Sequence, residues 1–252
     1  MRTKLMLSVL LLIFSISQAW ADERTALQLS KFHSRGQLFC ASAMLYFNPQ
    51  ERTPDPRLLS SMYNHLWAMQ ADVWQLGQPA DLVKPVEGIQ QLLDQLAGKT
   101  SEQKKDYPDL VRQLIVRVLQ LQRAADVAYA QEQSSFPADS TAVMFTDQSR
   151  ALASLLFDYE LRHYAMVDKE QFLMSPEQLQ KLDQGIENRF SQLLRLHTEH
   201  SATLGAIYRN YQFVRGQLQQ SKSRANGGAE FYVSRVVIDL DELALTTAVS
   251  AP

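Results

Sequence analysis

Residues 175–223 read SPEQLQKLDQGIENRFSQLLRLHTEHSATLGAIYRNYQFVRGQLQQSKS and carry a long amphipathic pattern. Ser175 can cap a helix N-terminus, Pro176 suits the first helical position, and Gln178 completes a capping box. Beyond this start, apolar or amphipathic side chains share one face of a helix, within an arc of about 80°. They are Leu179, Leu182, Ile186, Phe190, Leu193, His197, His200, Leu204, Tyr208, Tyr211 and Leu218.

This pattern predicts one continuous spine helix at about 176–223, because no further proline interrupts it. Such a helix would be roughly 70 Å long, which is typical of a bundle or coiled coil. The alternative is a turn at residues 201–205, which would give two ordinary helices whose second member packs back on the first.

Six further segments show helical periodicity, and most of them are separated by prolines or glycines. They are residues 25–47, 56–76, 81–96, 108–130, 140–167 and 231–243. The last segment is rich in β-branched valine, but its apolar residues are spaced for a helix rather than a strand. The chain is therefore predicted to be all-α, an elongated bundle of about six to seven helices.

Residues 22–252 are expected to form a single helical-bundle domain. Residues 131–139 contain serines and a proline and are the most linker-like part of the chain, so a subdivision at this point is the alternative.

The helix at residues 25–47 is predicted to be buried on two faces. Gly36, Cys40 and Ala43 place small side chains on one face, which would let another helix approach closely. A second apolar set lies on the opposite side: Leu27, Leu38 and Leu45. Cys40 is the only cysteine, and its place within the first face predicts a buried thiol. A reactive or intermolecular thiol is the alternative.

The first 21 residues have the features of a signal peptide. Arg2 and Lys4 give a positive start, a run of about a dozen apolar residues follows, and residues 19–21 read Ala-Trp-Ala. The apolar run is shorter than the ~20 residues that a membrane span needs. We therefore expect a cleaved signal peptide at 1–21, periplasmic or secreted localisation, and no stable membrane insertion after cleavage.

Charge argues against a nucleic-acid partner. Without Arg2 and Lys4, 23 of the 25 basic residues remain against 27 acidic ones, a formal charge of −4. No basic run exceeds the pair Lys104-Lys105, so the basic surface that nucleic acid requires is not expected.

Four residues are weak candidates for metal ligands: Glu160, His163, His197 and His200. Glu160 and His163 have the Glu-x-x-His spacing of di-iron bundles, but such a site needs a second motif and two more carboxylates. His197 and His200 share a helix face, yet antiparallel packing would place His163 roughly 25 Å away. Satisfied core or interface histidines are the favoured interpretation, with no metal and no cofactor.

No catalytic motif stands out, so enzyme activity is not the favoured interpretation. The chain has no Gly-x-Ser-x-Gly elbow, phosphate-binding glycine loop or His-Glu-x-x-His sequence. Several aromatic residues could instead line a groove between helices: Trp67, Trp74, Tyr159, Tyr164, Tyr208, Tyr211 and Phe213. The sequence thus favours an exported protein that binds a protein partner or a small molecule. The alternative is a metal- or cofactor-binding bundle, possibly enzymatic.

The signal-peptide interpretation predicts that the exported protein begins near Asp22. Intact mass of the protein recovered from a soluble extracytoplasmic fraction measures this directly. A membrane-bound species that retains residues 1–21 would contradict the localisation.

Overall fold

The computed structural model describes residues 2–51, 53–132, 140–219 and 228–250. Eight α-helices account for most of them, three short 3₁₀-helices join some of these, and no strand occurs in the described ranges. The α-helices are α1 (Arg2–Tyr46), α2 (Pro56–Gln75), α3 (Ala80–Ala97), α4 (Tyr107–Glu132), α5 (Thr141–His163), α6 (Pro176–Leu196), α7 (Ser201–Gln219) and α8 (Gly228–Ser250). The predicted all-α class is confirmed, and the helix count is close to the six to seven expected.

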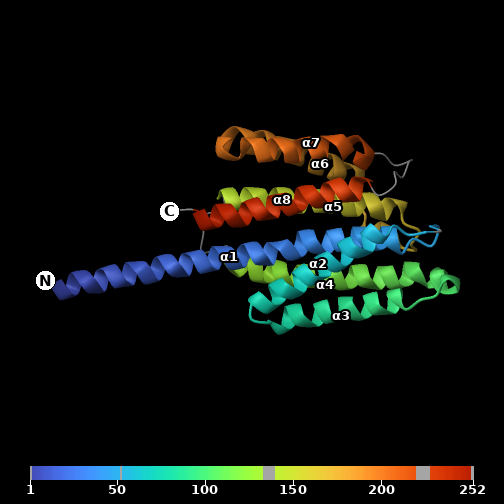
Figure 1. The fold of residues 1–252 in the computed structure, drawn as a ribbon, viewed down its shortest axis with the longest axis horizontal. Helices are drawn as coiled ribbons and strands as arrows, with labels where there is room; N and C mark the ends of the chain where they lie inside the picture. The colour runs from blue at the N-terminus through green and yellow to red at the C-terminus, as the bar shows by residue number, and fades with distance from the viewer. Residues whose placement is uncertain (1, 52, 133–139, 220–227, 251–252) are drawn as a thin grey trace.

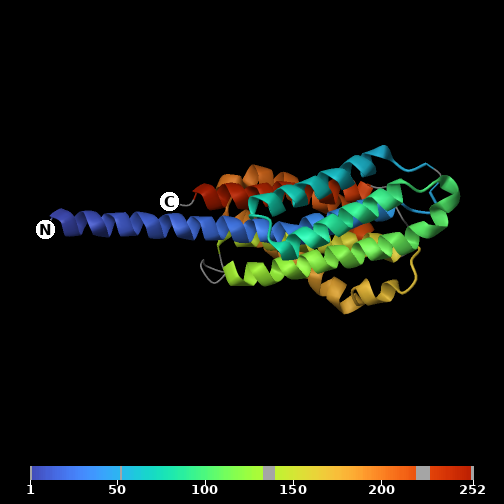
Figure 2. The same cartoon turned by 90° about the horizontal axis from the view of Figure 1, so that it is seen from below.

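Helix α1 lies in the middle of the bundle and separates two groups of helices. Figure 1 shows α2, α3 and α4 on one side of α1, and α5, α6, α7 and α8 on the other. Most helices run along the long axis of the molecule, and the first turns of α1 project beyond the others (Figure 2). Contacts within 8 Å join α1 to α2, α4, α5 and α8, so it touches both groups.

Two hydrophobic clusters flank α1, as the sequence predicted for this helix. Phe32, Cys40 and Ala43 belong to the cluster formed with α2, α3 and α4. Leu27 and Leu38 belong to the cluster formed with α5, α6, α7 and α8. The small residues of the first face allow close packing, since a Cβ on Gly36 would come within 2.7 Å of Val118 on α4.

The prediction of a spine helix at 176–223 is wrong, because residues 176–219 form a helical hairpin. The Ser175 capping box begins α6 as expected, but α6 ends at Leu196 and a 3₁₀ turn, η4 (Thr198–His200), precedes α7. His197, at the break, has φ −117° and ψ 65°, outside the α-helical range. The turn therefore lies just before residues 201–205, where the alternative interpretation put it.

Packing between the two arms explains the break. The ring of Phe190 lies 5.0 Å from that of Tyr208 and 5.6 Å from that of Tyr211. Arg215 bonds both carboxylate oxygens of Asp183, at 3.0 and 2.7 Å. A hairpin thus covers the apolar face of α7 with α6, whereas a straight helix would leave that cover to other segments. Both arrangements have the same 3.6-residue period, so the period alone could not separate them.

Residues 228–250 are helical, which confirms the choice of helix over strand for 231–243. Helix α8 packs on α5, α7 and α1. Near the start of α8, the ring of Tyr232 lies 4.9 Å from that of Phe213 on α7. The linker-like segment at 131–139 falls largely outside the described residues.

None of the helices in the described ranges combines the length and the apolar character needed to cross a membrane.

Spin labels at Gln192 and Gln217 should distinguish the hairpin from a straight helix. The antiparallel arms place these positions about 20 Å apart, whereas a continuous helix would separate them by about 38 Å. Double electron–electron resonance measures the distance. A single distribution centred near the longer value would contradict the hairpin.

Candidate functional site

Helix α2 carries exposed aromatic side chains on the side that faces away from α1. Asp55 caps the helix by accepting from the backbone N–H of Arg57, and Pro56 occupies its first position. Leu58, Met62, Leu66, Met69 and Val73 turn inward. Trp67 and Trp74 point outward, with 59% and 71% of their surfaces exposed, and the ring of the half-buried Tyr63 lies 5.8 Å from that of Trp67.

The two tryptophans form a regular pair. They are seven positions apart in the sequence, so their Cα atoms lie about 20° apart around the helix and about 10.5 Å apart along its axis. We call Tyr63, Trp67 and Trp74 the aromatic stripe. Large aromatic groups are usually buried in a monomeric protein, which makes this stripe a candidate binding surface.

A groove of about 560 Å³ runs between α2 and α3, beside Trp74. Its floor is apolar, with Val73 and Val86 buried, and its rim consists mainly of glutamine amides. The lining residues are Gln70, Val73, Trp74, Gln78, Val83, Val86, Glu87, Gln90 and Gln91. Gln70 Nε2 donates to Gln90 Oε1 at 3.3 Å, which joins the two walls.

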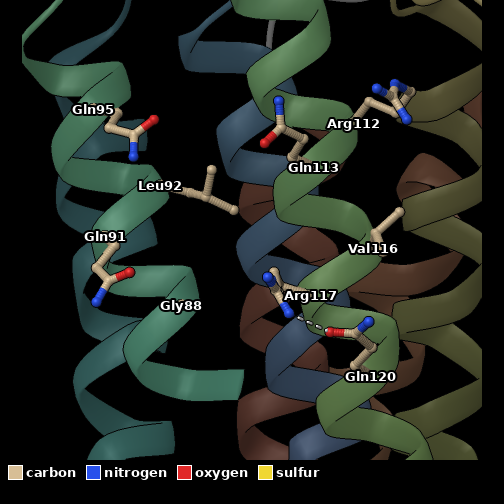
Figure 3. Close-up of a pocket in the computed structure, with 9 residues that line it drawn as sticks. All are labelled: Gly88, Gln91, Leu92, Gln95, Arg112, Gln113, Val116, Arg117 and Gln120. Carbon is tan, nitrogen blue, oxygen red and sulfur yellow. Dashed lines mark hydrogen bonds between the residues drawn. The ribbon is translucent and has the colours of Figure 1, made fainter. Parts of the chain in front are cut away.

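A second groove of about 390 Å³ lies on the other side of α3, against α4 (Figure 3). Gly88 lines it and leaves room for the Arg117 side chain, whose Cδ and Nε lie 3.5 Å from the position of a glycine Cβ. Arg117 Nη1 donates to Gln120 Oε1 at 2.9 Å. Gln91 lines both grooves, so the surface of α2, α3 and α4 is a continuous amide-rich face.

The α2 part of this face is almost uncharged. Between Arg57 and Asp81 the sequence contains only two acidic, basic or histidine side chains, His65 and Asp72, and both are turned inward. Burial lowers the pKa of His65 to about 3, with a further contribution from Arg35. Burial also raises the pKa of Asp72. Glu87 is the single charged side chain that lines the α2–α3 groove.

Behind this face, a buried polar cluster joins α1, α2 and α8. Glu230 Oε1 accepts from the hydroxyls of Ser42 at 2.7 Å and Ser61 at 2.8 Å. Because the Ser61 proton goes to Glu230, the 3.3 Å contact to His65 Nε2 makes that nitrogen the donor. A general base needs the reverse, a bare Nε2 facing the serine. The cluster therefore has the arrangement of a structural network rather than of a nucleophile with its base.

A second serine–histidine pair, His33 and Ser154, also lacks the orientation of a catalytic pair. His33 Nε2 lies 3.1 Å from Ser154 Oγ, but the group 3.5 Å from Nδ1 is the Arg150 guanidinium. Burial and this cation together lower the pKa of His33 to about 4. A carboxylate at Nδ1 would stabilise the imidazolium formed during catalysis, whereas a guanidinium opposes it.

The buried position of Cys40 agrees with the sequence prediction. Its side chain is nearly inaccessible, and burial raises the pKa of the thiol far above its usual range. The thiolate that a reactive cysteine requires is therefore strongly disfavoured.

The four metal candidates do not come together. His163 Nδ1 lies 2.7 Å from the carbonyl oxygen of Tyr159, near one end of α5, and Glu160 is buried. His197 and His200 lie around Phe145 at the other end of α5, with ring centroids 5.6 and 6.2 Å away. Phe145 and His163 are separated by about 27 Å of helix. Within the described ranges, no three His, Cys, Asp or Glu residues are grouped so as to hold a metal ion.

The other aromatic candidates have different environments. Tyr159, Tyr164 and Tyr211 are core residues, and Tyr208 packs at the α6–α7 contact. Phe213 is exposed on α7, far along the chain from the grooves. The sequence predicted that both tryptophans could line a groove, but it did not predict a part for the glutamines around them. The scarcity of charge between residues 58 and 80 was the available signal.

Comparisons of the chain with protein-family models, with curated proteins and with solved structures found no match. The amide-rich face is therefore interpreted from its own geometry.

The backbone conformation of Gln78, at the end of the α2–α3 groove, is expected to lower the free energy of unfolding. It has φ 59°, a left-handed conformation that costs an ordinary residue about 1–2 kcal/mol. Gln78→Gly should therefore raise the free energy of unfolding by about 1 kcal/mol, less any entropy gained by the unfolded chain. Urea denaturation measures the change. Gln91→Gly, within helix α3, is the matched control and should lower stability by about 1 kcal/mol. Equal losses in both variants would contradict the strain assigned to Gln78.

Proposed function

We propose that this protein is an exported binding protein that takes its ligand on the amide-rich face of α2, α3 and α4. The observation that carries the proposal is the pair of exposed indoles, Trp67 and Trp74, beside a groove with an apolar floor. Binding, rather than catalysis, is the activity that such a face supports.

The energetics of the aromatic stripe favour a ligand. A fully covered tryptophan buries about 150–250 Å². At about 25 cal/mol per Å², the exposed 59% of Trp67 and 71% of Trp74 leave some 2–4 kcal/mol per indole unrealised. A ligand that covers both indoles would gain this free energy. Tryptophan is also among the residues most often found to dominate binding energy at interfaces.

The groove adds orientation to this apolar contact. Glutamine amides both donate and accept hydrogen bonds, and those of Gln70, Gln78 and Gln90 border the valine floor. Ligand pockets commonly combine apolar walls with a few such polar groups. The small number of charges nearby favours an uncharged ligand, or an uncharged part of a partner, over nucleic acid.

The internal polar clusters support a non-catalytic function. Both serine–histidine pairs are oriented against general-base chemistry, and the pKa values of His33 and His65 lie well below neutrality. They contribute instead to the contacts that join α1 to its neighbours.

Intrinsic fluorescence can report binding at this face alone. The chain has three tryptophans, so Trp20→Phe leaves only Trp67 and Trp74, whether or not residues 1–21 are removed. The protein would be screened by thermal shift against amino acids, sugars, nucleotides and polyamines, and against protein fractions from the cell envelope. We expect a ligand that raises Tm and shifts tryptophan emission to the blue.

Matched variants locate the binding. Trp67→Ala with Trp74→Ala should weaken it by roughly tenfold or more, with little change in the free energy of unfolding because both side chains are exposed. Phe213→Ala removes an equally exposed aromatic elsewhere, 74% exposed on α7, and should leave binding unchanged. A ligand that binds the double variant as tightly as the parent would place the site elsewhere. Stoichiometric transition metal in tag-free, chelator-free protein would favour the metal-binding alternative instead.

A further inference from the structure

We propose that the ligand of the amide-rich face is a β-1,4-linked glycan of uncharged hexose units, which lies along α2 with its rings against Trp67 and Trp74. This inference rests on the proposed function and specifies the chemistry of its ligand.

The first argument is the kind of surface that the stripe offers. A β-linked hexose ring has C–H bonds on its two faces and hydroxyl groups around its edge. The ring faces pack against flat aromatic surfaces, and the edge remains available for hydrogen bonds. Trp67 and Trp74 are exposed on one side of α2, and Tyr63 lies against Trp67.

The second argument is spacing. Helix geometry places the Cα atoms of the two tryptophans about 20° apart around α2 and about 10.5 Å apart along its axis, which is about the length of two hexose rings. A β-1,4-linked chain is an extended ribbon, so rings two units apart can follow the straight axis of α2. An α-1,4-linked chain coils and would leave the helix after contacting one indole.

The third argument is the polar rim. Gln78 and Gln91 present amide groups at the groove beside the stripe, while Gln70 donates to Gln90 across it and Gln90 donates to Asp94 at 2.8 Å. An amide can donate to one hydroxyl and accept from another, which suits the repeated hydroxyl groups of a sugar chain. Acetamido groups would find the same partners.

The fourth argument is charge. From residue 58 to residue 80 no acidic or basic side chain faces outward, and Glu87 alone is charged in the groove lining. A polyanion lying along α2 would lack counter-charges, because the arginines of this face, Arg112 and Arg117, line the α3–α4 groove instead. A charged peptide on α2 would bury its charges without partners. A neutral glycan has neither cost.

The test uses the Trp20→Phe protein and four sugars as probes. These are the hexamer of β-1,4-linked N-acetylglucosamine, cellohexaose, maltohexaose and the N-acetylglucosamine monomer. Fluorescence titration, repeated by calorimetry, should show saturable binding of at least one β-1,4 hexamer with a blue shift in emission. Maltohexaose and the monomer, which reach only one indole, should bind at least roughly tenfold more weakly. Preference for the N-acetylated hexamer would indicate a cell-wall type of glycan, and preference for cellohexaose a secreted polysaccharide.

Variants test the geometry. Trp67→Ala and Trp74→Ala should each weaken binding of the hexamer by roughly tenfold and reduce the preference for hexamer over monomer. Gln91→Ala should weaken it by a few-fold, as expected for one lost hydrogen bond. Phe213→Ala should have no effect, and unchanged Tm values confirm that each variant is folded.

Three results would overturn the glycan proposal. In the first, neither β-1,4 hexamer binds at millimolar concentration. In the second, maltohexaose binds as tightly as the β-1,4 hexamers. In the third, light scattering shows that the parent protein is a dimer and that the double tryptophan variant is a monomer. The proposed function would survive the first two results if another ligand from the screen still depended on Trp67 and Trp74. It would fail as well if no ligand did so.

Discussion

Burial of α1 on two opposite faces is the constraint on which the rest of the structure depends. Its small-residue face admits α4 so closely that a methyl group on Gly36 would lie within 2.7 Å of Val118. Its opposite face joins the core of α5, α6, α7 and α8. Because one helix completes both hydrophobic clusters, each group of helices is stabilised by packing on a shared element.

Most residues of α1 from Ala26 to Leu45 are buried, and several polar side chains in this part pair with helix α8. Ser42 donates to Glu230 of α8, and Ser34 donates to Asp241 of the same helix at 3.3 Å. Arg35 forms an ion pair with Asp241 at 3.6 Å, and burial raises the pKa of that carboxyl group. These polar contacts favour one orientation of α8 on α1, because another orientation would leave buried polar groups unpaired at a cost of about 1–3 kcal/mol each.

The same arrangement explains why the candidate binding face lies on α2. Helix α5 is in contact with α1, α6, α7 and α8, and its aromatic residues are buried in the core. Helix α2 packs on α1 and α3, and near its start Ser61 donates to Glu230 of α8, but its outer face is left uncovered by the described helices. Trp67 and Trp74 occupy that uncovered face, and the glutamines of α2 and α3 surround the groove beside them.

The sequence by itself determined the helical class, the position of most helices and the two-faced burial of α1. These properties are local: caps at Asp55, Ser140 and Ser175 and a 3.6-residue apolar period act within a few turns of chain. Only the tertiary structure decided that residues 176–219 fold into a hairpin and that Trp67 and Trp74 remain exposed while Tyr159 and Tyr211 are buried. The period shows that a helix has an apolar face, but the cover of any face depends on which distant helices pack against it.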